Sequence, residues 1–301
     1  YAEKSALAEG RWVKIKVTES GIHLISLSTL RQWGFTDPEK VRVYGYGGAP
    51  ISDVLTASSY IDDLPMTASE LTSRGLVFYA QGPESWAKLN NGRFSRTPNY
   101  YSQEAFYFLS DTGAENSIPA TGESRQADSP STTFTETILH EQELLSVGGT
   151  GHEFLGEDFL HTRSQNFNFT LPGRADSKLW IDCNFAIKTK ENSSTVTLSI
   201  NGTDLPLNSS NKLTHTGDDS ALHYRLFTIS SQAEAEGENL RLGIKFATSA
   251  NILRLARLDN IYVSYNRRLN LDGAQLTFRT EAKSMQLSGA SSSTRIWDVT
   301  S

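Results

Sequence analysis

The feature that most constrains the fold is an alternation of apolar and polar residues with a period of two. A strand places successive side chains on opposite faces, so this period predicts strands that each bury one face. The apolar positions are Phe167/Phe169/Leu171, Leu179/Ile181/Cys183/Phe185/Ile187, Val196/Leu198/Ile200, Leu222/Tyr224/Leu226, Leu240/Leu242/Ile244/Phe246, Ile261/Val263/Tyr265 and Leu276/Phe278. Such strands need a second sheet to cover them, which predicts a jelly-roll-like β-sandwich.

Two turn signals set the connections between expected strands. Val13, Ile15 and Val17 alternate with lysines, and residues 22–25 are expected to return after a turn as their hairpin partner. In the second half, Asn201-Gly202 follows an alternating run and is a strong signal for a two-residue hairpin turn.

The first hundred residues otherwise predict a mixed β-rich domain with a short helix. Ser28 is expected to cap a helix that runs through Trp33 and ends at Gly34. The runs at residues 75–80 and 105–109 are almost wholly apolar, which is typical of strands buried on both faces. The chain as a whole is therefore expected to be mainly β.

A change of composition predicts the domain boundary. Residues 111–133 are rich in Gly, Ser, Asp and Pro, which is typical of a linker. We expect an N-terminal domain at 1–125 and the sandwich at 126–280. Residues 281–301 are expected to start a further module or to add terminal strands, with short strands at 285–287 and 295–299.

Charge and hydropathy exclude two classes of partner. The formal net charge is −6, and no run of Lys or Arg offsets it, which argues against nucleic-acid binding. No apolar run approaches the roughly 20 residues that span a bilayer, so no transmembrane segment is expected. The first residue is Tyr1, which suggests a removed signal peptide or an excised fragment.

Catalytic and metal-binding motifs are weak throughout the sequence. Residues 45–48 read GYGG after a strand, but position 50 is Pro50 and no helix follows, so a turn is favoured over a phosphate loop. Cys183, the single cysteine, shares the apolar face of its strand and is expected to be a buried core residue. We therefore expect no catalytic residue and no cofactor in this chain.

Histidines and paired carboxylates allow a metal site as an interpretation, but their spacing disfavours it. His140, His152 and His161 lie near several acidic residues, yet without the spacing of a known zinc site. The pairs Asp62-Asp63 and Asp218-Asp219 suit turns or caps better than calcium. No metal is therefore expected.

Two tryptophans are candidates for ligand stacking. Flat apolar rings suit the faces of sugars, and Trp86 and Trp180 are the residues singled out for this role. Trp180 is expected on the strand face opposite Cys183, and Trp86 follows a Gly-Pro turn. Packing in the core or between domains is the commoner fate of tryptophan, so both readings stay open.

Ten short runs, in order along nearly the whole chain, resemble one family. They are GRWVKI at 10–15, SGI at 20–22, VYGYGG at 43–48, DDL at 62–64, VFYAQGP at 77–83, YS at 101–102, FYFL at 106–109, GEDF at 156–159, ARLD at 256–259 and WDVT at 297–300. Together they are similar to the N-terminal region of gingipain-type cysteine peptidase relatives. Among these relatives they resemble especially the PorU-like sortase family of the Bacteroidetes type IX secretion system.

This resemblance implies an exported protein at the outer-membrane surface or outside the cell. In that family a β-rich region precedes a peptidase domain with a catalytic His and Cys. No residue of this chain falls on those motifs, so the resemblance implies a non-enzymatic accessory region whose full-length parent carries a downstream cysteine peptidase. Its expected partners are downstream domains of the same protein or outer-membrane surface proteins.

Two further hypotheses remain beside this accessory or docking role. The first is a carbohydrate-binding module of a bacterial cell-surface protein, which requires at least two aromatic residues, such as Trp86 and Trp180, exposed on one surface. The second is a glycoside hydrolase, which needs two carboxylates about 5 to 9 Å apart in a cleft. Nothing in the sequence selects such a carboxylate pair.

Overall fold

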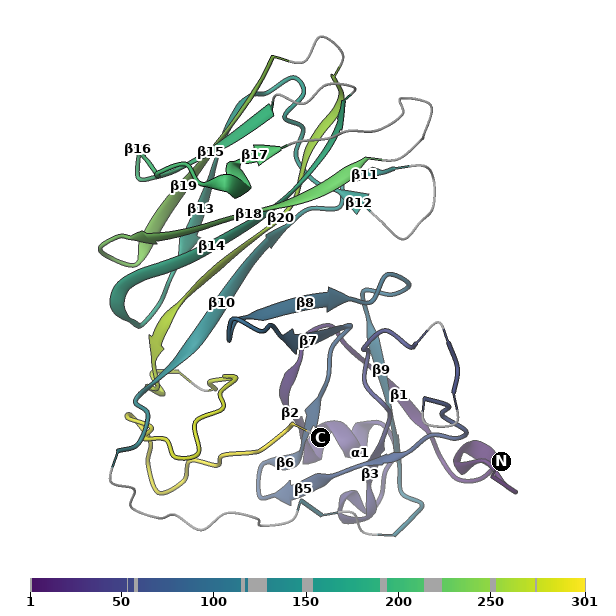
Figure 1. The fold of residues 1–301 in the computed structure, drawn as a ribbon. Helices are drawn as coiled ribbons and strands as arrows, with labels where there is room; N and C mark the ends of the chain where they lie inside the picture. The colour runs from purple at the N-terminus through teal and green to yellow at the C-terminus, as the bar shows by residue number, and fades with distance from the viewer. Residues whose placement is uncertain are drawn as a thin grey trace. The chain divides into compact units, whose positions relative to one another are not determined.

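The computed structural model describes residues 2–52, 54–56, 59–114, 117–118, 129–147, 154–189, 194–213, 224–249, 253–273 and 275–300. Within these ranges the chain is mainly β-strand (Figure 1), which confirms the expected fold class. The helical elements in the same ranges are α1 at Leu27–Gln32 and the 3₁₀ helices η1 at Ala6–Ala8, η2 at Pro38–Lys40 and η3 at Ser209–Asn211.

The chain divides into two compact units. The first consists of Tyr1–Gln126 together with Thr294–Ser301, and the second of Ala127–Ser293. A compact unit is not by itself an independently folding domain. The expected domain boundaries at residues 125 and 280 therefore stay a prediction.

The first unit contains two antiparallel sheets and a hairpin. The sheets have the strand orders β1-β9-β3-β4 and β2-β6-β5, and the hairpin pairs β7 with β8. The bounds are β1 Val13–Val17, β2 Gly21–Ser26, β3 Arg42–Tyr44, β4 Met66–Thr67, β5 Ser69–Thr72, β6 Gly75–Ala80, β7 Glu84–Lys88, β8 Phe94–Pro98 and β9 Ala105–Ser110. Apolar residues from both sheets and from α1 form one core.

The expected hairpin between β1 and β2 is wrong. β1 pairs with β9, and β2 pairs with β6, so the two strands belong to different sheets. At the corner between them, the backbone N–H of Gly82 donates to Oγ of Ser20 at 2.9 Å. A Cβ atom on Gly82 would meet the backbone of Glu19 at 2.9 Å. The turn that follows β6 therefore packs directly against the corner between β1 and β2. β1 and β2 do not pair with each other.

Helix α1 forms where the sequence predicts it, but with a different cap. Oγ of Ser26, rather than Ser28, accepts the backbone N–H of Thr29 at 3.0 Å, because Thr29 lies three residues after Ser26. Gly34 ends the helix with a φ of +91°, as expected. No helix in the described ranges is long and apolar enough to cross a membrane.

Strands β6 and β9 bury one face fully, not both as predicted. Phe78 of β6 is completely buried, while its neighbours Val77 and Tyr79 are half-buried. On β9, Phe106 is exposed and lies under the ammonium of Lys14, 3.7 Å from the ring centroid. On β9 the Lys14 side chain thus covers part of the Phe106 ring.

The second unit contains two larger antiparallel sheets and a small one. Their strand orders are β10-β20-β14-β18, β13-β19-β15-β16 with β17 beside β15, and β11-β12. The bounds are β10 Thr133–Glu141, β11 Leu145–Ser146, β12 Phe154–Leu155, β13 Ser164–Thr170, β14 Arg174–Thr189, β15 Ser194–Ile200, β16 Thr203–Asp204, β17 Lys212–Leu213, β18 Arg225–Glu234, β19 Asn239–Thr248 and β20 Leu253–Arg268.

One apolar core joins the two larger sheets, which confirms the predicted β-sandwich. Cys183 of β14 lies opposite Ile229 of β18 and Ile261 of β20, and all three are fully buried. From the same strand, the ring of Phe185 stacks on Phe246 of the other sheet, with centroids 5.4 Å apart. This core buries the apolar residues that the alternation predicted to face inward on β13, β14, β15, β19 and β20.

The predicted hairpin turn is confirmed at the end of β15. Ile200 pairs with Thr203 across the two turn residues, Asn201 and Gly202. Both turn residues have positive φ, +51° and +91°, as a type I′ turn requires.

Strand β18 buries the face opposite to the predicted one. Ile229 and Ser231 point into the core, whereas Leu226 is 47% exposed; Leu222 lies outside the described residues. The register with β14 decides the face, because Ile229 must lie opposite the buried Cys183. The alternation that placed Leu226 inside was therefore wrong for this strand.

The described part of residues 270–300 contains no strand, contrary to prediction. Instead of forming a strand, Phe278 packs its ring against Phe134 at 5.5 Å. The strands expected at 285–287 and 295–299 are wrong as well, since only isolated bridges form, Ser131–Met285 and Asn270–Ser288. Residues 284–288 instead hydrogen-bond to Ser131, just before β10, and to Leu269 and Leu271, just after β20.

Candidate functional site

Trp180 lies on the face of β14 that points away from the sandwich core. Its neighbours Leu179 and Ile181 belong to the core, and the alternation along the strand turns Trp180 outward, where it is half-buried. We call this outer surface the Trp180 face. Its members include Thr137, Leu139, Trp180, Asp182, Asn184, Leu226, Thr228, Ser230, Gln232, Asn260, Tyr262 and Ser264.

Short polar side chains cross the Trp180 face as hydrogen-bonded pairs. The pairs are Ser230–Asp182 at 2.6 Å, Thr228–Asn184 at 2.7 Å, Asn184–Asn260 at 2.7 Å and Thr137–Ser264 at 3.0 Å. Cross-strand pairs of this kind stabilise a sheet face and hold its side chains in fixed positions. The polar part of this surface is therefore preorganised.

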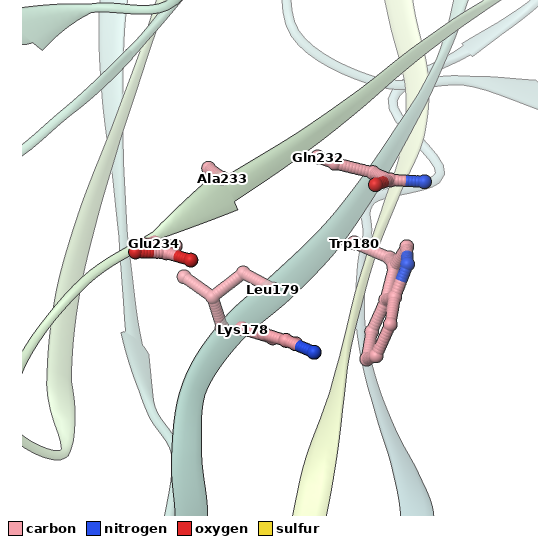
Figure 2. Close-up of a pocket in the computed structure, with 6 residues that line it drawn as sticks. All are labelled: Lys178, Leu179, Trp180, Gln232, Ala233 and Glu234. Atoms are coloured by element: carbon pink, nitrogen blue, oxygen red, sulfur yellow. The ribbon is translucent and has the colours of Figure 1, made fainter.

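A shallow pocket of about 270 Å³ lies at one end of this face. It is lined by Lys178, Leu179, Trp180, Gln232, Ala233 and Glu234. Figure 2 shows Lys178, Trp180 and Gln232 reaching toward the same side of β14 and β18. Trp180 lies opposite Gln232 in register, and Lys178 lies opposite Glu234. The pocket thus combines one aromatic ring with amide, ammonium and carboxylate groups.

Trp86 is held within the β7–β8 hairpin of the first unit. Its indole N–H donates to Oε1 of Glu84 at 3.0 Å, and Oε2 of the same carboxylate binds Arg96 at 2.5 Å. Trp86 and Trp180 belong to different units, so a shared surface for the two stays a prediction. The same is true of a ligand-stacking role for either ring.

Cys183 is fully buried between the two sheets. Desolvation by burial raises the pKa of its thiol, and the carboxylate of Asp182 raises the pKa further. A protonated, buried thiol is a poor nucleophile. The position of Cys183 in the core is the one that the alternation of its strand predicts.

The glycine run and the first aspartate pair both serve local structure. Gly45 and Gly47 have φ values of +154° and +82°, which fits the predicted turn. Asp63 accepts the backbone N–H groups of Ala6 at 2.5 Å and of Leu64 at 2.8 Å and the hydroxyl of Ser5 at 3.0 Å, and these bonds lower the pKa of its carboxyl group. Asp218-Asp219 lies outside the described residues.

Two histidines form separate pairs with carboxylates. Nε2 of His140 lies 2.6 Å from Glu157, and Nδ1 of His161 lies 2.7 Å from Asp158. His152 lies outside the described residues. Within the described part of the chain, no group of three His, Cys, Asp or Glu side chains is arranged to hold a metal ion.

Sequence reasoning found Trp180 but missed its neighbours on the Trp180 face. Gln232 was missed because the buried face of β18 was misassigned, and that assignment depends on the register with β14. Tyr262 lies opposite Asp182, and the period-two pattern of β20 already places it on the outer face. That alternation was the signal which could have found it.

The comparison that decides the family is with a solved structure. The crystal structure of dimeric latent PorU from Porphyromonas gingivalis matches 92% of this chain at 30% sequence identity, with a TM-score of 0.80. The chain is a relative of PorU. This PorU-like chain spans 26% of the length of that protein. The resemblance inferred from the ten sequence runs is thereby confirmed.

Two other structural matches are much weaker. BpGH86A, a β-porphyranase of glycoside hydrolase family 86 from Bacteroides plebeius, covers 86% of the PorU-like chain and 35% of its own at 9% identity, with a TM-score of 0.28. The VP2 protein of infectious bursal disease virus covers 89% of the chain and 72% of its own at 11% identity, with a TM-score of 0.27. Scores this low carry no argument. No protein-family model matches the chain, and no curated protein does.

Proposed function

We propose that this chain is a non-catalytic accessory region of an exported PorU-like protein, and that it docks further parts of that protein. The observation that carries the proposal is the match to PorU, which extends over 92% of this chain but only 26% of PorU. A region of this kind positions other modules at the outer-membrane surface or outside the cell. Outer-membrane surface proteins are the other class of partner for the same role.

The loop between β3 and β4 supports a docking role. Six large apolar side chains in it are exposed, namely Tyr46, Ile51, Val54, Leu55, Tyr60 and Ile61. Val54 and Leu55 are the most open of these, at 70% and 63%. We call residues 46–61 the apolar loop.

The base of the apolar loop is fixed by hydrogen bonds. The backbone N–H of Gly45 donates to the carbonyl of Pro65 at 2.9 Å, which closes the loop at its two ends. Asp63, just after the loop, accepts hydrogen bonds from Ser5 and from the backbone N–H of Ala6. A cluster of exposed apolar side chains on an anchored base is typical of a protein interface.

A non-catalytic role is supported by the environment of the only cysteine. Cys183 lies in the core of the sandwich, where burial keeps its thiol protonated. The nucleophile of a cysteine peptidase must instead be accessible and readily deprotonated. In this proposal the catalytic groups belong to parts of the PorU-like protein outside residues 1–301.

Amide hydrogen exchange tests whether the apolar loop docks the rest of the protein. Exchange in residues 46–61 is measured in the 301-residue chain and in the complete protein that the gene encodes. Docking buries the loop, so we expect exchange there to slow by about tenfold or more in the complete protein. The segment around Leu207, which is 59% exposed in the other unit, is the matched control.

Substitution of the loop separates docking from general stabilisation. Leu55→Asp places a charge in the proposed interface, and it is expected to restore fast exchange of the loop in the complete protein. Leu207→Asp, at a position of similar exposure, is expected to leave loop exchange unchanged. Equal exchange of the loop in the 301-residue chain and in the complete protein would contradict the docking role.

A further inference from the structure

Two of the polar groups that line the pocket on the Trp180 face are the indole N–H of Trp180 and the side-chain amide of Gln232. Among the described residues, neither the indole N–H of Trp180 nor the side-chain amide of Gln232 makes a hydrogen bond. The two residues lie directly opposite each other on β14 and β18. They line the same pocket, and Figure 2 shows both side chains on the same side of the strands. An aromatic ring with free donors and acceptors beside it is suited to a ligand that is apolar on its face and polar at its rim.

The neighbours of Trp180 leave room beside its ring. On β20 the opposite residue is Ser264, whose short side chain is buried and tied to Thr137 at 3.0 Å. A serine side chain is too short to cover the face of an indole ring. Tyr262 lies diagonally across from Trp180, and on a sheet such diagonal neighbours are about 7–8 Å apart. A second aromatic residue thus stands on the same face.

The charges around the pocket select the kind of ligand. Asp182 and Glu234 supply two negative charges, and Lys178 supplies one positive charge, which leaves a net charge of −1. That balance disfavours nucleic acid and other polyanions. The apolar side chains of this face, Trp180, Tyr262, Leu139 and Leu226, are interrupted by hydrogen-bonded polar pairs, whereas a protein interface has a contiguous apolar centre.

We infer that the Trp180 face binds a neutral oligosaccharide. One pyranose ring stacks on Trp180 in the pocket, and its hydroxyls bind Gln232, Glu234 and Lys178. The following sugar units lie along the Trp180 face toward Asp182 and Tyr262. A pocket of about 270 Å³ is near the lower end of the range for small-ligand sites, about 300–1,000 Å³, which suits one ring with the rest of the chain outside it.

The inference is independent of the docking role. It uses the second unit, whereas the apolar loop belongs to the first. It also differs from a site shared by Trp86 and Trp180, because every group that it invokes lies on β10, β14, β18 or β20. A failure of either proposal leaves the other intact.

Titration of the full 301-residue chain with sugars tests the inference. The probes are cellopentaose, laminaripentaose and mannopentaose, followed by calorimetry and by tryptophan fluorescence. We expect at least one pentaose to bind, and we expect Trp180→Ala to weaken that binding about tenfold or more, since ring stacking is lost. Trp180→Phe keeps a smaller ring and is expected to bind with intermediate affinity.

Two controls keep the test decisive. Gln232 is exposed, so Gln232→Ala tests the pocket without disturbing the core, and it is expected to weaken binding several-fold. Trp86→Ala removes a half-buried tryptophan from the other unit and is expected to leave binding unchanged. Absence of binding by all three pentaoses, or equal affinity of the wild-type chain and Trp180→Ala, would overturn the inference.

A parallel titration distinguishes the source of the sugar. Intact lipopolysaccharide and its delipidated polysaccharide are compared with the same variants. Similar affinity for both, with loss in Trp180→Ala, assigns recognition to the sugar chain whether it is free or membrane-bound. Binding of intact lipopolysaccharide alone would assign recognition to the lipid and would contradict the inference.

Discussion

The imidazole of His140 and the carboxylate of Glu157 meet at the edge of the sandwich, with Nε2 and Oε1 2.6 Å apart. The imidazole also packs on the ring of Phe167, with centroids 4.8 Å apart. The Glu157 side chain is only 13% exposed, and its second oxygen, Oε2, is buried without a partner among the described residues. This pair therefore ties β10 to the segment after β12 by a partly buried contact.

Glu157→Ala is expected to destabilise the chain by about 1–3 kcal/mol, because it removes a partly buried hydrogen bond to a charged group. Urea unfolding measures the change in the free energy of unfolding. His161→Ala is the matched control, since the His161 side chain is 77% exposed although it lies 2.7 Å from Asp158. It should change stability by less than about 0.5 kcal/mol. Equal effects of the two substitutions would show that the His140–Glu157 contact adds nothing beyond a surface pair.

Cys183 is expected to resist thiol reagents in the folded chain and to react at once in denaturant. Burial raises the pKa of its thiol, so the thiolate that reacts is scarce as long as the sandwich is intact. The rate of labelling by Ellman's reagent, with and without guanidinium chloride, measures this difference. Rapid labelling of the native chain would place Cys183 at the surface and contradict its position in the core.

The raised pKa of Cys183 also predicts a pH dependence of stability. In the unfolded chain the thiol ionises near pH 8.5, whereas the folded chain keeps it protonated. The stabilisation is therefore complete below about pH 8.5 and is lost by about 1.4 kcal/mol per unit as the pH rises above it. The difference in unfolding free energy between wild type and Cys183→Ala should shrink by about 2 kcal/mol from pH 8.5 to 10. A stability difference that stays constant over this pH range would contradict the raised pKa of the Cys183 thiol.

Gly75 is predicted to tolerate no side chain. Its φ is +149°, and a Cβ would lie 2.1 Å from the carbonyl oxygen of Ile25, on the neighbouring strand. Gly75→Ala is expected to destabilise the first unit by about 3 kcal/mol or more, through both strain and the clash with backbone. Gly92→Ala also has positive φ, +79°, but meets nothing within 4 Å, so it should cost only about 1 kcal/mol. Thermal unfolding of the two variants compares them directly.

The sandwich was predictable because its strands carry a strict period of two. Leu242, Ile244 and Phe246 fall on one face of their strand. An apolar face of this kind needs a covering layer, and the structure buries all three residues. The turn at Asn201-Gly202 was predictable for the same local reason, since few residue pairs adopt positive φ twice in succession.

What the sequence could not provide was the pairing between strands distant along the chain. β1 and β2 read as a hairpin locally, but β1 pairs with β9, about ninety residues away, and that choice depends on the shared core. The face of β18 and the position of Gln232 depend on register with β14 in the same way. The sequence therefore predicted only part of the candidate site. It placed Trp180 on the outer face of its own strand but did not identify Gln232 beside it.

The complete coding sequence tests the central claim, that this chain is an accessory region of a longer PorU-like protein. Sequencing the gene beyond the codon for Ser301 gives the answer in one step. The account predicts several hundred further residues, with a histidine and a cysteine of the gingipain type among them. A stop codon soon after Ser301 would contradict it and would leave a free-standing surface protein, for which the sugar titrations would become the main test.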